Sequence, residues 1–203
     1  MKLMIAIPST GYMHYMFSQS LANLLKKLHH TADINCDVVF HGASMIHLGR
    51  EELTNKAIDG EYDHVLWLDS DMVFDDDIVD KLYATMKEYD CDLVAGVFRS
   101  RHGGMTSCLF ESLNPDIRIK EYPDKPFKIE GCGMACVLVK TSMLQRIWDA
   151  NGHCFLPTAM HSEDIALCYR AKKLDMIMMA NPDVKVGHMA NGVLWPDKTF
   201  NYI

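Results

Sequence analysis

The sequence lacks several features that would place it in a class of protein directly. No apolar run reaches the length needed to cross a membrane. The amino-terminal MKLMIAIPSTG has an apolar core too short for a signal peptide, and no cleavage-type site follows it. No Gly/Ser-rich or Pro-rich linker, internal repeat or low-complexity tract divides the 203 residues. We therefore expect a soluble protein with one domain, residues 1–203.

An excess of positive charge is also absent. The 20 Lys and Arg residues are outnumbered by 27 Asp and Glu residues, so the net charge is −7. Nucleic-acid-binding proteins usually present a basic face, and the acidic balance argues against general binding to a phosphate backbone.

The seven cysteines lack the spacing of a zinc site or a redox centre. Their number is odd, and no C-x-x-C pair occurs among them. Disulfides are rare in the cytosol, where thiols stay reduced. The cysteine pattern therefore predicts reduced thiols in a cytoplasmic protein.

Apolar periodicity predicts alternating strands and helices from the amino terminus to about residue 98. The predicted strands are 2–8, 34–42, 64–69 and 91–98, and the intervening helices begin near Gly11, Gly49 and Asp76. This βαβαβαβ order predicts a parallel, doubly wound sheet.

The chain changes character after residue 98. Residues 99–128 contain short strand-like pieces broken by RHGG, NPD and YPDKP, which predicts a loop-rich, partly antiparallel region. The remaining predicted elements are a buried strand at 128–140, helices capped by Thr141 and Ser162, strands at 176–180 and 184–189, and a carboxyl-terminal tail.

Two aspartates follow a strand that is apolar on both faces. Val65, Leu66, Trp67 and Leu68 form a continuous apolar run, and Asp69 and Asp71 come just past its carboxyl end. Binding crevices of open α/β sheets lie outside these strand ends. Carboxylates one residue apart repel each other unless a cation lies near both, so the pair predicts a divalent metal beside a ligand.

The next three aspartates have a simpler explanation. Asp75, Asp76 and Asp77 precede a helix, and acidic residues are stabilised at a helix N-terminus. We therefore predict that they form an N-cap and an acidic first turn, outside the site.

Three further polar residues are candidates for the same site, and each has an ordinary alternative. Glu163 and Asp164 follow Ser162 at a helix start, where they either complement the helix dipole or provide a general base. His188 follows the strand-like VKVG and is either an ordinary histidine or a metal ligand.

In combination these pieces resemble the GT-A family of nucleotide-sugar glycosyltransferases, particularly its small inverting members related to family 2. The resemblance covers nearly the whole chain and rests on AIPSTG, GREELTNKAIDGEYDHVLWLDSDM, IEGCGMACVLVKTSML, HSEDIALCYRAKKLD and VGHM. It implies an α/β fold of GT-A type. A Rossmann-like nucleotide-binding half with a mostly parallel sheet would span about residues 1–98, and a smaller mixed or antiparallel half for acceptor and metal would span 99–203.

The resemblance also implies an activity and a role for each matched residue. A sugar would pass, with inversion, from a UDP- or GDP-linked sugar to an acceptor hydroxyl, and the chain would be the catalytic unit alone. Asp164 would be the catalytic base, and Glu163 would hold the acceptor or serve as the alternative base. The metal ligands would be Asp69, Asp71 and His188, and Asp69 would also face the ribose. The nucleotide and sugar site would comprise Pro8, Ser9, Thr10, His41, Arg50, Asp69, Ser70, Gly131 and Gly133.

Two positions depart from the family pattern. Relatives often carry asparagine where this chain has Glu51, and an acidic residue at the end of the second strand where it has His41. Both differences bear on how the nucleotide base is recognised.

The implied chemistry needs these residue types. A divalent cation offsets the charge that develops on a leaving diphosphate. Oxygen ligands suit Mg²⁺ or Mn²⁺, and an imidazole ligand favours Mn²⁺. Inversion needs a carboxylate on the face opposite the leaving group to take the acceptor's proton.

Two other functions compete with this hypothesis. Residues 69–73, DSDMV, also fit the opening motif of haloacid-dehalogenase-type phosphatases, in which the first Asp is a nucleophile. In those phosphatases the motif normally lies at the end of the first strand of the fold. Here two strand-helix units precede it, which argues against this function. A non-catalytic nucleotide-sugar-binding module needs only the metal and nucleotide contacts and leaves Asp164 unexplained.

The acceptor is expected to be a saccharide, a lipid-linked molecule or a protein. Because the protein is acidic, a nucleic acid is a less expected acceptor than these three classes. Acceptor specificity is expected in residues 99–128 and in the loop 152–161.

Overall fold

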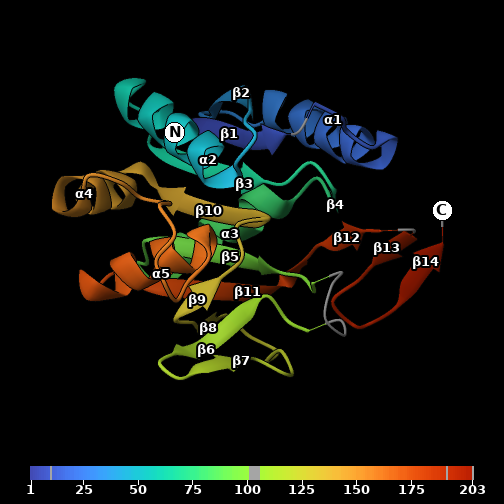
Figure 1. Cartoon of the computed structure of the whole chain (residues 1–203). Coiled ribbons are helices and arrows are strands. Elements are labelled where there is room, and N and C mark those ends of the chain that lie inside the picture. Colours follow the sequence, from blue (N-terminus) through green and yellow to red (C-terminus); the bar gives the residue numbers. More distant parts are fainter. Residues whose placement is uncertain (10, 101–105, 191, 203) are drawn as a thin grey trace.

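A seven-stranded sheet forms the centre of the molecule (Figure 1). This computed structural model describes residues 1–9, 11–100, 106–190 and 192–202. From edge to edge the strands are β2 (Asn35–Gly42), β1 (Lys2–Ser9), β3 (His64–Leu68), β10 (Cys136–Lys140), β5 (Leu93–Val97), β11 (Met178–Lys185) and β8 (Phe127–Lys128).

The sheet is parallel apart from two strands. β1 pairs in parallel with β2 and β3, and β5 pairs in parallel with β11. β10 lies between β3 and β5 and is antiparallel to both, and β8 is antiparallel to β11. The predicted mostly parallel α/β sheet is confirmed. Strands from both sides of residue 98 share it.

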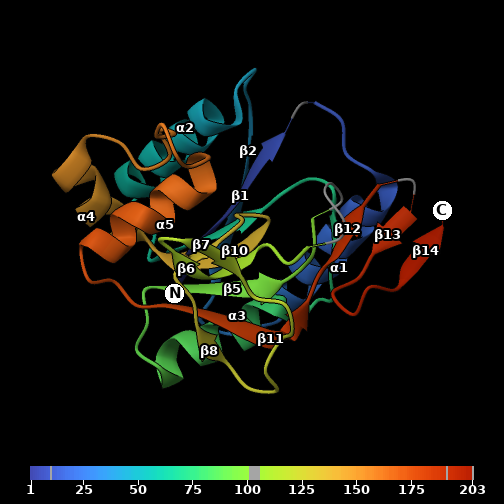
Figure 2. The same cartoon turned by 60° about the horizontal axis from the view of Figure 1, so that its bottom comes forward.

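Helices cover both faces of the sheet (Figures 1 and 2). On one face lie α1 (Tyr15–His29) and α3 (Ile78–Glu88), and on the other lie α2 (Ile46–Asp59), α4 (Thr141–Asn151) and α5 (Glu163–Lys173). Alternate side chains of β1 enter two separate cores, Ile5 toward α1 and α3 and Met4 toward α2. Because both faces are covered, the strand is apolar at every interior position.

A three-stranded sheet extends the second half of the chain. Its order is β7 (Asp116–Arg118), β6 (Leu109–Leu113) and β9 (Gly131–Cys132), and all its pairings are antiparallel. The predicted partly antiparallel region is therefore confirmed. Gly131 and Cys132, at the Gly-x-Gly interruption, pair with β6, and β10 returns to the central sheet.

The prediction of a carboxyl-terminal tail is wrong. The last residues form an antiparallel sheet with strand order β14 (Phe200–Tyr202), β13 (Gly192–Leu194), β12 (Gly187–Met189) and β4 (Met72–Val73). These strands are three residues or shorter, too short to show a period-2 pattern in the sequence.

Two predicted helix caps differ in detail. Lys140, not Thr141, is the N-cap of α4, and the buried Thr141 hydroxyl makes no hydrogen bond in the described residues. Ser162 is the N-cap of α5, as expected, but its hydroxyl donates to Asp164 Oδ1 and accepts no hydrogen bond from a helix amide in the described residues. Asp77 is the N-cap of α3 and pairs with Lys81 at 2.8 Å.

Candidate active site

A cavity of about 800 Å³ opens at the carboxyl ends of β1, β2 and β3. We call it the larger cavity. Parallel pairing places Pro8 opposite His41 and Ser9 opposite Gly42, so loops from two adjacent strands leave the sheet at one edge. The predicted site residues that line it are Pro8, Ser9, His41, Asp69, Ser70 and Asp71. Thr10 lies outside the described residues.

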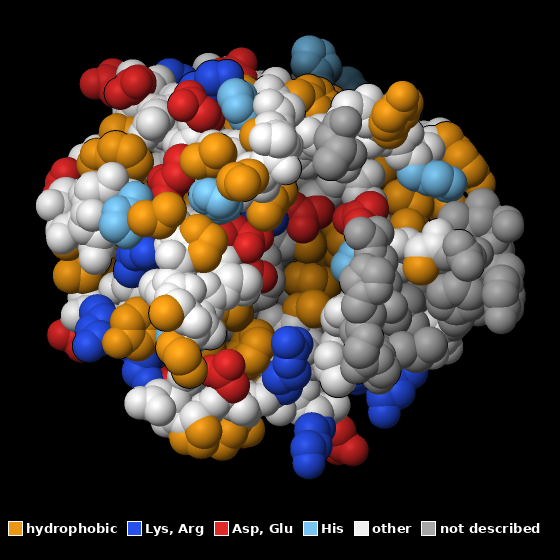
Figure 3. All heavy atoms as spheres, in the orientation of Figure 1, with side chains coloured by type: hydrophobic (Ala, Val, Ile, Leu, Met, Phe, Trp, Pro, Cys, Tyr) orange, Lys and Arg blue, Asp and Glu red, His pale blue; other side chains and the backbone are white. Residues whose placement is uncertain are grey.

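A cavity of about 260 Å³ adjoins the larger one. We call it the smaller cavity. Asp69 lines both cavities, so the two spaces meet at the end of β3. Figure 3 shows acidic side chains gathered around a hollow in the middle of this face. The predicted site residues that line the smaller cavity are Arg50, Asp69, Gly133, Glu163, Asp164 and His188.

Strand pairing brings Asp71 and His188 together. β12 runs antiparallel to β4 with His188 opposite Met72, and the Met189 amide donates to the Asp71 carbonyl at 2.9 Å. His188 Nε2 then lies 3.4 Å from Asp71 Oδ2. The other ring nitrogen, Nδ1, lies 2.9 Å from the carbonyl oxygen of Arg99. Because a carbonyl only accepts, Nδ1 carries a proton, and the ring is oriented with Nε2 toward the Asp71 carboxylate.

Asp71 and His188 alone provide fewer ligands than a preformed metal site requires. Within the described part of the chain, no three His, Cys, Asp or Glu side chains converge on one point. Asp71 and His188 are the pair that lies within contact distance. A cation held there would take its remaining ligands from water or from a bound molecule, as Mg²⁺ does with substrate phosphates.

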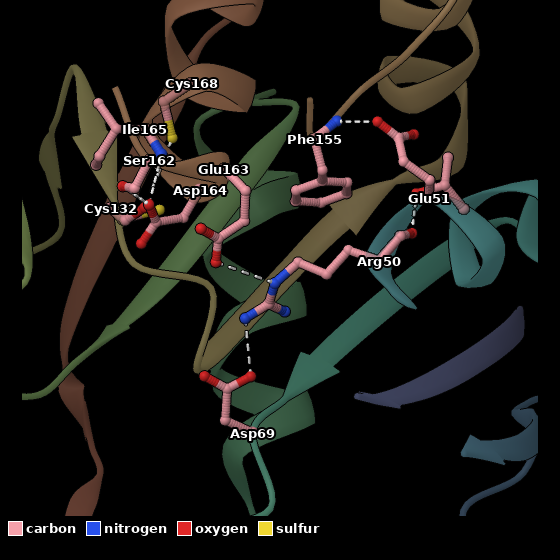
Figure 4. A network of polar contacts seen from close by, with 11 residues as sticks. Arg50, Glu51, Asp69, Cys132, Phe155, Ser162, Glu163, Asp164, Ile165 and Cys168 are labelled. Atoms are coloured by element: carbon pink, nitrogen blue, oxygen red, sulfur yellow. Dashed lines mark hydrogen bonds and ion pairs between the residues drawn. The ribbon is translucent and has the colours of Figure 1, made fainter. Parts of the chain in front are cut away.

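Arg50 connects the two sides of the site (Figure 4). It rises from α2 with its side chain 3% exposed, and Nη2 donates to Asp69 Oδ1 at 2.9 Å. Its Nε lies 3.8 Å from Oε1 of Glu163, at the start of α5. The aromatic rings of Trp67 and Phe155 lie 5.6 and 5.9 Å from the guanidinium carbon and exclude water from it.

Two nitrogens of Arg50 lack a hydrogen bond. Nε and Nη1 are both buried without a hydrogen-bond partner in the described residues. Nε still faces Glu163 at 3.8 Å, whereas no ion pair is formed by Nη1 there, and Arg50 lines the smaller cavity. A buried donor without a partner costs roughly 1–3 kcal/mol, so the arrangement favours a ligand that brings an oxygen to this nitrogen.

Glu163 and Asp164 occupy different environments although they are adjacent. Burial raises the pKa of the Glu163 carboxyl, the charge of Asp164 raises it further, and the Arg50 guanidinium opposes both. Asp164 Oδ1 accepts from the Ser162 hydroxyl and, at 2.8 Å, from the Ile165 amide. These two donors fix the orientation of the Asp164 carboxylate.

Gly133 lies beside the ring of Phe98 and the Asp164 carboxylate. A Cβ at Gly133 would crowd the Phe98 ring at 3.0 Å and would make ordinary contact with Asp164 Oδ2 at 3.5 Å. Gly131 is different, because a Cβ there would meet the Leu113 side chain at 2.9 Å. Gly131 packs against β6 and lines neither cavity.

Cys108 also lines the smaller cavity. Burial raises the pKa of its thiol to about 12, so the sulfur stays protonated at neutral pH and is a poor nucleophile. None of the seven cysteines is paired in a disulfide in this structure.

The structure adds contacts that the sequence did not reveal. Glu51, beside Arg50 on α2, accepts hydrogen bonds from the amides of Cys154 at 3.0 Å and Phe155 at 2.5 Å. Arg170 of α5 donates to the carbonyls of Cys154 at 2.8 Å and Leu156 at 2.6 Å. The partly buried Glu51 and the buried Arg170 therefore hold the start of the loop that carries Phe155 against Arg50. In the sequence, these contacts were indicated only by the departure from the family pattern at Glu51.

No protein-family model and no curated protein matches this chain. Similar solved structures do exist. A197 from STIV is 21% identical with a TM-score of 0.74, and the match covers 100% of this chain and 94% of A197. S. aureus TarS, residues 1–349 in complex with UDP-GlcNAc, is 13% identical with a TM-score of 0.55, and the match covers 90% of this chain and 56% of that one. A longer TarS structure has a TM-score of 0.54 and 15% identity, with 35% of it covered.

These similarities establish the fold. The central sheet, its two helical layers and the antiparallel additions are those of a GT-A-type α/β protein, as predicted. This chain spans about half of the TarS fragment that holds UDP-GlcNAc. Of the helices in the described ranges, none is both long enough and apolar enough to traverse a bilayer.

Proposed function

We propose that this chain is a metal-dependent glycosyltransferase, which moves a sugar from a nucleoside-diphosphate sugar to an acceptor hydroxyl with inversion. The main support is that Asp69 borders two cavities with complementary groups. The larger cavity has the size and the strand-end position of a nucleotide site, and the smaller one holds two carboxylates suited to proton transfer. The complex of TarS with UDP-GlcNAc makes UDP-linked sugars the first donors to test, before GDP-linked ones.

The Asp71–His188 pair fits a divalent cation. A carboxylate oxygen and an imidazole nitrogen suit Mn²⁺, with Mg²⁺ as the alternative, and the Arg99 carbonyl fixes the ring so that Nε2 faces the carboxylate. Asp69 is the third residue expected here, although Arg50 already holds its Oδ1. Such a cation would offset charge on the leaving diphosphate.

Asp164 is proposed as the base. The Ser162 hydroxyl and the Ile165 amide hold Oδ1, and Oδ2 lies beside Gly133 in the lining of the smaller cavity. A carboxylate fixed in this way can take a proton from an acceptor hydroxyl within hydrogen-bond reach. Glu163 remains the alternative base, because its raised pKa brings it closer to the operating pH.

Arg50 is proposed to bind the donor sugar or its phosphate through Nη1. The guanidinium is already oriented by Asp69 and Glu163, so a ligand oxygen would meet a fixed donor. Gly133 is proposed to allow the sugar to approach the backbone closely, and the same role for Gly131 remains a prediction from the resemblance.

A donor screen tests the proposal. Candidate UDP- and GDP-linked sugars are incubated with the protein and Mn²⁺, and released nucleoside diphosphate is measured with and without saccharide acceptors. Release that depends on the donor and on Mn²⁺ supports the proposal. Turnover of a generic aryl phosphate without any nucleotide sugar would favour the phosphatase hypothesis. Nucleotide-sugar binding without release from any donor would leave only a binding module.

A further inference from the structure

A third cavity of about 280 Å³ continues outward from the smaller one. The two share Phe110, Arg118, Ser162 and Ile165 as lining residues. The outer end is bordered by residues of the β6–β7 hairpin and of the segment before α5, namely Asp116, Met160 and His161. We call the combined space the outer groove. It begins at Asp164 and opens to solvent beside Met160, which is 83% exposed.

Arg118 is the basic side chain that spans both parts of the outer groove. Its Nη1 donates to the Ser107 carbonyl at 2.7 Å, and its guanidinium carbon lies 4.5 Å from the centre of the Phe110 ring. One edge of the planar group is therefore anchored and one face is supported. Such a guanidinium is oriented before a ligand arrives and loses little freedom on binding one.

The charge of Arg118 is not compensated as that of Arg50 is. Arg50 has carboxylates at 2.9 and 3.8 Å, from Asp69 and Glu163. Arg118 forms no ion pair with any carboxylate in the described residues, and its polar partner there is a neutral carbonyl. In a protein of net charge −7, an oriented guanidinium without a counter-ion is a specific position for an anionic group.

We propose that the outer groove binds the acceptor and that Arg118 selects acceptors carrying an anionic group, phosphate or carboxylate, besides the hydroxyl that receives the sugar. The inference rests on the proposed function, because the acceptor hydroxyl must reach Asp164 at the inner end. The anionic group then lies toward the outer end, and the apolar side chains of Phe110, Met160 and Ile165 flank the acceptor between them. Planar bidentate contact with phosphate or carboxylate is the recognition for which arginine is suited and lysine is not.

The test uses three probes that share one sugar ring: glucose, glucose 6-phosphate and glucuronic acid. Ligand-observed NMR measures their affinities for the full chain in the presence of UDP and Mg²⁺, for the wild type and for Arg118→Gln, Arg118→Lys and Arg146→Gln. Arg146 is the matched control, because it is an exposed arginine on α4 whose Nη2 also donates to a backbone carbonyl, that of Leu174, at 3.2 Å. Calorimetry of UDP with each variant monitors the donor site.

The wild type is expected to bind one of the two anionic probes about 10- to 100-fold more tightly than glucose, the usual effect of a charge-assisted contact. Which of them binds distinguishes phosphate from carboxylate. Arg118→Gln should abolish the preference, Arg118→Lys should restore little of it, and Arg146→Gln should retain it, with UDP affinity the same in all four proteins. Equal affinity for the three probes, or a preference that survives Arg118→Gln, overturns the inference while the proposed function stands. Loss of UDP affinity in Arg118→Gln also overturns it, since Arg118 would then contact the donor. Absence of UDP and GDP binding in the wild type overturns the proposed function and this inference with it.

Discussion

His188 Nε2 lies 3.4 Å from Asp71 Oδ2, and the antiparallel pairing of β12 with β4 creates this contact. Neither side chain is fully buried, at 15% and 30% exposed, so both border a space that solvent reaches. We expect Asp71→Asn and His188→Ala each to weaken Mn²⁺-assisted binding of UDP or GDP. Loss of outer-shell partners of a metal ligand costs about 10- to 100-fold in affinity, and loss of a ligand should cost at least as much. Calorimetry with Mn²⁺ and with a chelator measures the effect.

Two controls separate metal binding from folding. His29→Ala changes an exposed histidine at the end of α1 and should leave nucleotide affinity as it is. If wild-type affinity for the nucleotide is the same with Mn²⁺ and with chelator, the metal role is wrong. Loss of cooperative melting in Asp71→Asn would instead identify a structural residue.

Asp164→Asn should lower sugar transfer by roughly 10²- to 10⁴-fold, which is the usual contribution of a positioned proton acceptor. Nucleotide affinity should barely change, and stability should move little, because the amide oxygen can still accept from the Ser162 hydroxyl and the Ile165 amide. Steady-state kinetics with a confirmed donor and acceptor provides the measurement.

The same kinetics on two further variants makes the Asp164 assignment specific. Asp80→Asn removes an acidic residue from the first turn of α3, away from both cavities, and should leave transfer unchanged. A larger rate loss in Glu163→Gln than in Asp164→Asn would reverse the assignment and make Glu163 the base.

Glu163→Gln should increase the free energy of unfolding at pH 7. Burial and the charge of Asp164 raise the pKa of Glu163 in the folded state, so its ionised form is the less stable one there. The stability that protonated Glu163 contributes is complete below the ordinary glutamate pKa of about 4.3 and is lost as pH rises through the higher folded pKa. The gain from glutamine should therefore be present at neutral pH and absent near pH 4. Urea denaturation at both values tests this, with the exposed Glu111→Gln as the control that should show no such difference.

Glu51→Gln should destabilise the fold by about 1–3 kcal/mol. The amides of Cys154 and Phe155 donate to different oxygens of Glu51, and glutamine would place an NH₂ donor against one of them. The loop 152–161 should then exchange its amide hydrogens faster, which hydrogen-exchange mass spectrometry detects. Glu52→Gln, one position along the same helix and exposed, is the matched control. Unchanged exchange in this loop would show that Arg170 alone holds it.

Local sequence patterns predicted the elements that have enough length to show a period. The apolar run of β3 and the helical spacing in α3 and α5 identify these elements, and the strand-end position of Asp69 follows from the first of them. The three-residue strands β12 to β14 were missed as a sheet because their stability comes from pairing with one another and with β4.

Long-range contacts were the least predictable part of the site. The expectation that His188 lies close to Asp71 came from the family resemblance, and the sequence around His188 gives no reason for it. The sequence showed Glu51 only as a departure from the family pattern. Its contacts with the loop were not predictable, because the two amide partners are 103 and 104 positions away. The outer groove depends on the packing of β6 and β7 against the start of α5, which no local pattern specifies.

The antiparallel strand β10 also has a consequence for synthesis of the chain. β1, β2, β3 and β5 all precede it in the sequence, yet β3 and β5 lie on either side of β10 and each pairs with it. Until residues 136–140 have been synthesised, β3 and β5 each retain an open edge, and such edges are templates for pairing with other chains. Residues 1–98 contain most of the residues that line the larger cavity, but a fragment limited to them would carry both exposed edges and should aggregate.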